Sequence, residues 1–209
     1  MLTSRLLRKL LCYEVGLFPL DRRLCSEKTI YLTFDDGPNP IHSNKVMDIL
    51  AKYDIKATFF VIGAHVEKEM DTAKRMVREG HLLGNHTNTH RILPNVSKEE
   101  RILEIETCQK IIDMLQHSNN KLFRPPQGLV TISDILYLRL KNYRTLLWSI
   151  DSNDHLLVGD FDSHLRHLAK SQNIVLFHDD NGACIEPLTT LLPIWIDQGF
   201  RFAIPYHGM

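Results

Sequence analysis

The chain has 209 residues, of which 44% are hydrophobic and 24% are charged. These fractions are ordinary for a globular protein, and the length suffices for a single domain with one substantial core. The 25 Lys and Arg residues balance the 25 Asp and Glu residues, so the charge gives no electrostatic reason to expect nucleic acid as a partner.

Residues 1–27 are interpreted as an N-terminal extension, and residues 28–209 as one domain. Within residues 1–20 a leucine-rich stretch with basic side chains is compatible with peripheral contact with a membrane and, equally, with packing on the domain; it contains Leu2, Arg5, Leu6, Leu7, Arg8, Lys9, Leu10 and Leu11. Glu14 interrupts the apolar run and no small-residue cleavage site follows, so a secretory signal is not indicated. No run approaches ~18 uncharged apolar residues, so no transmembrane segment is predicted.

The most informative segment begins at residues 29–34, where β-branched and aromatic residues alternate. This pattern predicts a buried strand, and Asp35-Asp36-Gly37-Pro38 predicts a tight turn at its end. Carboxylates at the carboxyl end of such a strand face a crevice. Since two like charges this close need a cation or a shared proton, we interpret Asp35 and Asp36 as part of a functional site.

Strands and helices alternate from residue 28 onward. Ser43 is placed to cap a helix, and Ser97 with Glu100 forms the signature of a capping box that opens a longer helix. The expected apolar faces are Val46, Ile49, Leu50 and Tyr53 on the first helix and Ile102, Ile105, Cys108, Ile112 and Leu115 on the second. Further strands are expected at residues 57–62, 82–83, 122–123, 146–148, 174–177 and 200–204. This alternation favours an α/β fold with parallel strands and helices outside.

Two histidines four positions apart, His86 and His90, follow one of these strands in a stretch too polar for a core. With one aspartate they supply three protein ligands and leave room for water, which is the composition of a catalytic metal site. Zinc is the expected metal. Two histidines and a carboxylate also suit non-haem Fe(II), so an iron oxygenase is a second enzyme class compatible with these residues.

Three later segments place reactive groups after apolar runs: residues 123–128 contain Arg124, residues 148–154 end in carboxylates, and residues 174–179 end in His178-Asp179. In their order, the motifs TFDDGP, HTxxH, RPPxG, WSxDxxD and LFHD resemble those of the NodB-type polysaccharide deacetylases, carbohydrate esterase family 4, from about residue 29 to the end of the chain. The resemblance implies an incomplete, distorted (β/α) barrel with about seven parallel strands.

The resemblance also implies a role for each of the polar residues. Asp36, His86 and His90 would hold one divalent metal, zinc first and cobalt or nickel as alternatives. Asp35 would be the general base towards the water that the metal activates, and Arg124 would keep that base ionised.

His178 matches the catalytic acid of the family, and Asp154 would favour its protonated form. The implied reaction is removal of the N-acetyl group from an amino sugar, in a GlcNAc-type oligosaccharide, polysaccharide or glycolipid precursor. The alternatives are a catalytically silent carbohydrate-binding relative and a hydrolase of another acyl group, O-acetyl or N-formyl. No proposed base, acid or ligand is missing from the motifs, which favours an active enzyme.

Oxyanion and substrate-binding positions implied by the resemblance are Pro126, Gln127, His155 and Leu176. The family usually has an aromatic residue, most often Tyr, where this chain has Gln127. In the family, the backbone N–H of the residue at this position helps to bind the oxyanion. A backbone donor survives replacement of the side chain, so the departure affects the shape of the groove. His155 stands where the family usually has Trp, which predicts a more open site.

Four cysteines, Cys12, Cys25, Cys108 and Cys184, are scattered without a CxxC pair or a disulfide-like framework. We interpret them as free thiols in a reducing compartment, which predicts a cytoplasmic protein.

Overall fold

The structure is a computed structural model that describes residues 28–117, 121–154 and 173–205. Predictions for residues 1–27, with Cys12 and Cys25, and for His155 concern positions outside the described residues. The elements are β1 (Thr29–Asp35), α2 (His42–Ala51), β2 (Thr58–Val61), α3 (Gly63–Lys68), α4 (Met70–Arg78), β3 (Leu82–Asn85), η1 (Leu93–Asn95), α5 (Lys98–Leu115), β4 (Lys121–Phe123), η2 (Pro126–Gly128), α6 (Ile132–Leu140), β5 (Tyr143–Thr145), β6 (Ile150–Asp151), β7 (Asn173–His178), α8 (Ile185–Asp197) and β8 (Arg201–Phe202).

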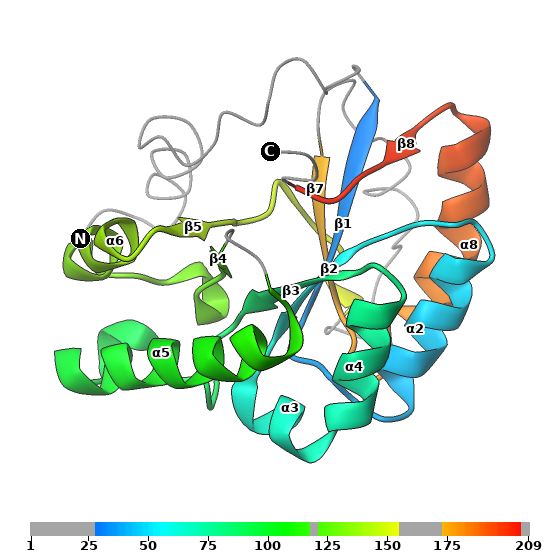
Figure 1. Ribbon diagram of the computed structural model, residues 1–209. Coiled ribbons are helices and arrows are strands. Elements are labelled where there is room, and N and C mark those ends of the chain that lie inside the picture. The colour runs from blue at the N-terminus through cyan, green and yellow to red at the C-terminus, as the bar shows by residue number, and fades with distance from the viewer. Residues whose placement is uncertain (1–27, 118–120, 155–172, 206–209) are drawn as a thin grey trace.

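The strands form one curved parallel sheet, ordered β5-β4-β3-β2-β1-β7-β6, with β8 paired to the start of β1 (Figure 1). Seven strands along this path confirm the predicted distorted (β/α) barrel. The central strand β1 is buried along its whole length. Its register places Asp35 opposite Phe60 of β2 and His178 of β7, so strand pairing alone brings two of the predicted site residues level with each other.

The main core lies between this sheet and helices α2, α4 and α8, which cover one face in Figure 1. Phe34 of β1 stacks on Phe59 of β2 with ring centroids 5.0 Å apart and on Phe177 of β7 at 5.9 Å. These three rings are fully buried. Aromatic stacking across the strands therefore ties together the part of the sheet that carries the polar residues at its end.

The predicted capping box is confirmed: Ser97 Oγ accepts from the backbone N–H of Glu100, and the Glu100 carboxylate accepts from the backbone N–H of Ser97. A second one, between Thr131 and Asp134, opens α6. Of the apolar face predicted for α5, Ile105, Cys108 and Ile112 are buried. The thiols of Cys108 and Cys184 are free and buried.

Ser43 was expected to cap a helix, and that prediction was wrong. Helix α2 already begins at His42, and the Asn39 side chain accepts from the backbone N–H groups of Ile41 and His42. Ser43 is fully buried inside the helix, and its hydroxyl group donates to Asp179. The polar side chain that resembles a cap is thus used in a tertiary contact.

The strand expected at residues 146–148 was also wrong: β5 ends at Thr145 and β6 begins at Ile150. Between them the carbonyl oxygens of Leu146 and Leu147 accept from Arg124. These carbonyls bind a side chain of the site in place of a neighbouring strand. Within the described ranges, no helix has the length and apolar character needed to cross a membrane.

The Phe34–Phe59 stack generates a stability prediction. Phe59→Ala should lower the free energy of unfolding by about 3–5 kcal/mol because it removes a fully buried ring and leaves a cavity. The matched control Leu103→Ala, at a largely exposed position of α5, should change it by less than about 0.5 kcal/mol. Urea unfolding followed by circular dichroism measures both. A loss below about 1 kcal/mol for Phe59→Ala would contradict the packing described.

Candidate active site

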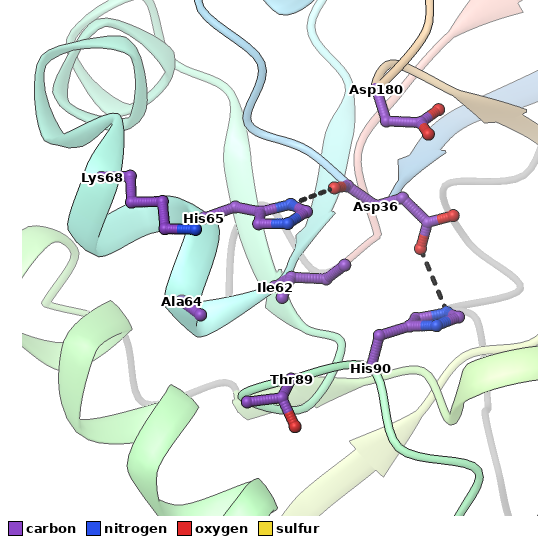
Figure 2. A pocket seen from close by; sticks show the side chains of 8 residues that line it. All are labelled: Asp36, Ile62, Ala64, His65, Lys68, Thr89, His90 and Asp180. Carbon is purple, nitrogen blue, oxygen red and sulfur yellow. Dashed lines mark hydrogen bonds and ion pairs between the residues drawn. The ribbon is translucent and has the colours of Figure 1, made fainter.

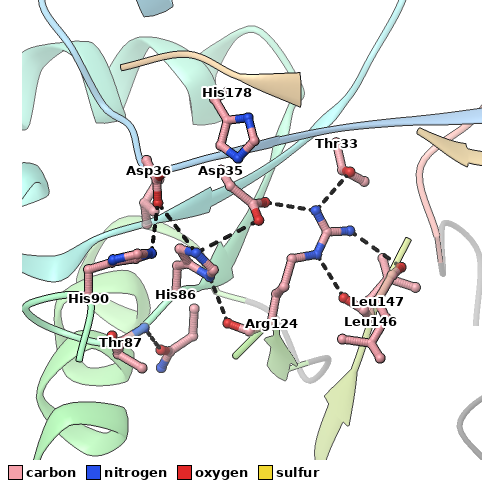
Figure 3. A network of polar contacts seen from close by, with 12 residues as sticks. Thr33, Asp35, Asp36, His86, Thr87, His90, Arg124, Leu146, Leu147 and His178 are labelled. Carbon is pink, nitrogen blue, oxygen red and sulfur yellow. Dashed lines mark hydrogen bonds and ion pairs between the residues drawn. The ribbon is translucent and has the colours of Figure 1, made fainter. Parts of the chain in front are cut away.

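Polar side chains converge at the carboxyl ends of the parallel strands (Figure 3). Asp35 is the last residue of β1 and His178 the last of β7, while His86 and Arg124 directly follow β3 and β4. Parallel strands present their carboxyl ends at one edge of a sheet, where α/β proteins bind ligands. Segments far apart in sequence therefore contribute to a single site.

Asp36, His86 and His90 form a compact cluster. Asp36 Oδ1 lies 3.4 Å from His86 Nε2 and 3.2 Å from His90 Nε2, and one ligand atom from each residue lies within 4.8 Å of the others. Among the described residues, this buried oxygen has these ion-pair contacts but no hydrogen-bond partner. Burial raises the pKa of Asp36, but the histidines around it, His86 foremost, outweigh burial and lower the pKa to about 2. The carboxylate therefore stays ionised at neutral pH.

The backbone at this cluster is held in unusual conformations. Asp36, Thr87 and His90 have φ angles of 74°, 69° and 59°, in the left-handed region that non-glycine residues rarely adopt. The Asn85 side chain accepts from the backbone N–H of Thr87, and a ring nitrogen of His65 donates to the carbonyl oxygen of Asp36 at 2.8 Å. These contacts help to offset the local backbone strain at Thr87 and Asp36.

The donor set fits a divalent cation. His86 Nδ1 lies 2.7 Å from the carbonyl oxygen of Arg124, and because a carbonyl oxygen only accepts, Nδ1 carries the proton and leaves the Nε2 lone pair of a neutral ring available. Burial lowers the pKa of His86, whereas Asp35 and Asp36 raise it, with a net increase. For His90 burial prevails and the pKa is lowered. Two imidazole nitrogens and one carboxylate match a catalytic metal site.

Asp35 is paired with a buried cation. Arg124 is fully buried, and its Nη1 atom lies 2.7 Å from Asp35 Oδ1 and 2.9 Å from Thr33 Oγ1. The guanidinium lies over the Phe60 ring, 4.1 Å from its centroid. Burial lowers the pKa of Arg124, and the charge of Asp35 opposes that effect. The other Asp35 oxygen lies 3.7 Å from His86 Nε2. One carboxylate therefore contacts both the guanidinium of Arg124 and the cluster of Asp36, His86 and His90.

His178, which lies opposite Asp35 in the register of β1 and β7, is paired with Asp154. Its Nδ1 atom lies 2.7 Å from Asp154 Oδ1, and its backbone N–H donates to Asp154 Oδ2 at 2.8 Å. Burial lowers the pKa of His178, but the hydrogen bond and charge of the fully buried Asp154 outweigh it and raise the pKa to about 9. The contact with Asp154 therefore favours the protonated imidazole.

A cavity of about 370 Å³ opens beside the cluster (Figure 2). This volume is within the ~300–1,000 Å³ range of ligand pockets. The cavity is lined by Asp36, Ile62, Ala64, His65, Lys68, Thr89, His90 and Asp180. Because Asp36 and His90 of the cluster line it, a molecule in the cavity would lie next to any cation held by the cluster.

Three of the four predicted substrate-binding residues fall within the described ranges. Pro126 is buried in η2, Gln127 is exposed with a φ angle of 56°, and Leu176 is buried in β7 opposite Thr33. None of the three lines the cavity. Gln127 belongs to the loop that carries Arg124, so its position is compatible with a role at the edge of the site.

Sequence reasoning missed Thr33 and His65. Thr33 had a readable signal, because residues two apart on a strand share a face and Thr33 is two residues before Asp35. His65 lies in the short helix α3 after β2, and only the fold shows that it reaches the carbonyl oxygen of Asp36. Nothing in its local sequence distinguishes it from a surface histidine.

The fold and the site define a hydrolase-like α/β protein with a candidate metal centre at the sheet edge. Residues 23–146 match the family model described as polysaccharide deacetylase. A peptidoglycan-N-acetylglucosamine deacetylase of Bacillus cereus is 36% identical over 184 residues, covering 85% of this chain and 86% of the relative. A chitooligosaccharide deacetylase of Rhizobium leguminosarum bv. trifolii is 36% identical over 166 residues, covering 77% and 76%.

Solved structures agree with these relatives. A crystal structure of a peptidoglycan N-acetylglucosamine deacetylase in complex with 4-naphthalen-1-yl-N-oxidanyl-benzamide superposes with a TM-score of 0.79 at 30% identity, covering 84% of this chain and 85% of that chain. The chain therefore belongs to the polysaccharide deacetylases, which are N-deacetylating hydrolases. Members of this family depend in general on a divalent metal.

The cluster geometry predicts different metal contents for two neighbouring variants. Asp36→Ala should weaken zinc binding by more than about 100-fold because it removes a proposed ligand. Asp35→Asn should bind zinc nearly as the parent does, since that side chain is paired with Arg124. Chelator-stripped proteins titrated with zinc and analysed by mass spectrometry give both affinities. A metal-free Asp35→Asn protein with a metal-replete Asp36→Ala protein would reverse the assignment.

Proposed function

We propose that this protein is a metal-dependent hydrolase that removes the N-acetyl group from an amino sugar of the GlcNAc type. The observation that carries the proposal is the convergence of three units at one sheet edge. These units are the Asp36–His86–His90 cluster, the Asp35–Arg124 pair and the His178–Asp154 pair. Amide hydrolysis needs an electrophilic centre, a base and an acid, and each unit can supply one of them.

In this proposal Asp36, His86 and His90 hold one divalent cation. The nitrogen and oxygen donors suit zinc best, and cobalt or nickel are compatible with the same set. A bound cation supplies a Lewis acid that polarises an acyl oxygen and increases the acidity of a nearby water.

Asp35 acts as the general base. Arg124 binds Oδ1 and thereby fixes the orientation of the carboxylate, while Oδ2 is directed towards the cluster. This oxygen can accept a proton from a water that attacks the acyl carbon. Because the guanidinium is buried, water does not compete for its hydrogen bond to the Asp35 carboxylate.

His178 acts as the general acid. An amine leaves from an amide only when its nitrogen is protonated, so the reaction needs a donor on the leaving-group side. Asp154 accepts from Nδ1 and so leaves Nε2 to hold the proton that is transferred. The substrate class is supported by the relatives, whose names give peptidoglycan N-acetylglucosamine and chitooligosaccharides.

Acetate release tests the function directly. The parent protein, restored with zinc after chelation, should release acetate from N-acetylated chitooligosaccharides or from peptidoglycan fragments. Asp35→Asn, matched in metal content, should lose about 10²–10⁴-fold in turnover because it lacks the base. Release from O-acetylated or N-formylated sugars alone would change the acyl group proposed. Binding of the glycans without any release would indicate a catalytically silent relative.

The raised pKa of His178 predicts the pH dependence. Asp154→Asn removes the charge that raises this pKa, so the pKa falls. A group that must be protonated loses its contribution as pH rises through its pKa, so the alkaline limb of kcat/KM should move to lower pH by on the order of one unit. A cation at the cluster lowers the pKa in parent and variant alike, so the difference between their profiles is the measurement.

Asp197→Asn, at an exposed position of α8, is the matched control for this pH profile and should leave it unchanged. An alkaline limb that stays in place in Asp154→Asn would exclude His178 as the acid controlled by Asp154.

A further inference from the structure

Helix α6 carries an apolar stripe on its solvent side. Ile132, Leu136 and Leu140 are 78%, 59% and 83% exposed. They recur every four residues and so lie along one side of the helix. Three large aliphatic side chains on a nine-residue helix are more than the scattered single residues that any surface shows, and a contiguous apolar patch marks an interaction surface.

The exposed charged residues of α6, with the residue that follows it, are positive. Arg139 and Lys141 are exposed, and no ion pair between described residues involves either of them. The acidic residue of α6, Asp134, is buried and paired with Arg101 of α5, with Arg101 Nε and Asp134 Oδ1 2.8 Å apart. The surface therefore combines exposed aliphatic groups with exposed cations and has no exposed carboxylate on this helix.

We propose that α6 binds an anionic lipid surface through Ile132, Leu136 and Leu140, with Arg139 and Lys141 contacting the headgroups. The charge pattern decides between the candidate occupants. A second copy docked through α6 would offer Arg139 and Lys141 no carboxylate from its own α6, because Asp134 is buried and paired with Arg101. An anionic bilayer instead supplies negative headgroups to the cations and a hydrocarbon boundary to the stripe.

The chain's own N-terminal extension is the other apolar candidate to cover the stripe on α6. Its basic residues have the same sign of charge as Arg139 and Lys141. Residues 1–20 bring Arg5, Arg8 and Lys9 together with their leucines, so docking on α6 would place cations beside cations. The like sign instead makes the two segments complementary to one common anionic surface.

The location of α6 connects this surface to the active site. Four residues separate Gln127, in the loop that carries Arg124, from Ile132 at the start of α6. The Thr131–Asp134 capping box fixes the angle at which this loop enters the helix. Binding through α6 would hold the active-site loop close to the headgroup layer. If the proposed function holds, the enzyme would then act on amino sugars attached to or lying against a membrane.

Co-sedimentation of the full chain with vesicles tests the proposal without relying on activity. The parent should bind vesicles of phosphatidylcholine with phosphatidylglycerol and not vesicles of phosphatidylcholine alone, and binding should weaken at high salt. Substitution of Ile132, Leu136 and Leu140 by Gln, which keeps helix propensity, should lower the partition coefficient at least about tenfold. The double variant Arg139→Glu, Lys141→Glu should lower it similarly.

The matched control is the double variant Leu103→Gln, Met114→Gln, which removes exposed aliphatic side chains from α5 and should bind vesicles as the parent does. All variants should deacetylate a soluble chitooligosaccharide at the parent's rate, which separates failure of this proposal from failure of the proposed function. Equal vesicle binding by the α6 variants and the control would overturn the proposal.

Two other outcomes would also overturn it. A parent that forms dimers abolished by the α6 substitutions, without binding vesicles, would assign the stripe to a second copy of the chain. In the second outcome the parent does not bind vesicles, and proteases cut residues 1–27 faster in the α6 variants than in the parent. That result would assign the stripe to the N-terminal extension.

Discussion

The buried guanidinium of Arg124 is the contact on which the site depends. Its side chain donates to Asp35 and Thr33 of β1 and to the carbonyl oxygens of Leu146 and Leu147 beyond β5. The carbonyl oxygen of Arg124 also accepts from His86. One residue thereby positions the proposed base and a proposed metal ligand. Removing one partner of a buried ion pair lowers the free energy of unfolding by about 3–5 kcal/mol because the other charge is left uncompensated. Asp35 and Arg124 therefore depend on each other for stability as well as for their proposed roles in the reaction.

Backbone strain is concentrated around the same motifs. Seven described non-glycine residues have positive φ angles, and five of them lie in motifs identified from the sequence: Asp36, Thr87, His90, Gln127 and Asn153. Such conformations cost of order 1–3 kcal/mol each and persist only where surrounding contacts determine them. The β sheet supplies those contacts at its edge. The residues that carry the polar side chains can therefore keep unfavourable backbone conformations in an ordered site.

The fold and the site residues were predictable from the sequence to different degrees. Parallel strands followed from the alternation of apolar segments, and the grouping of Asp35, Asp36, His86 and His90 followed from polar residues placed after strands. The loop around Leu146 was misread because Leu-Leu-Trp has the composition of a strand, while its carbonyls are needed by a distant arginine. Local patterns report propensity and burial, whereas a tertiary hydrogen bond such as Ser43 to Asp179 leaves no periodic signal in the chain.

The same tertiary contact explains the glycine of the first motif. A Cβ atom at Gly37 would collide with the Asp179 carboxylate, which is fully buried and accepts from Ser43. Burial, together with the nearby Asp180, Asp36 and Asp35, raises the pKa of Asp179 to about 7.

The site thus gathers Asp35, Asp36, Asp154, Asp179 and Asp180 around one guanidinium and two imidazoles with raised pKa values, those of His86 and His178. Even with both imidazoles protonated, these three groups carry fewer positive charges than five ionised carboxylates carry negative ones. The carboxylates at this sheet edge can all remain close together only if some are protonated or if further positive charge is bound. A divalent cation held by Asp36, His86 and His90, as proposed, would supply that charge.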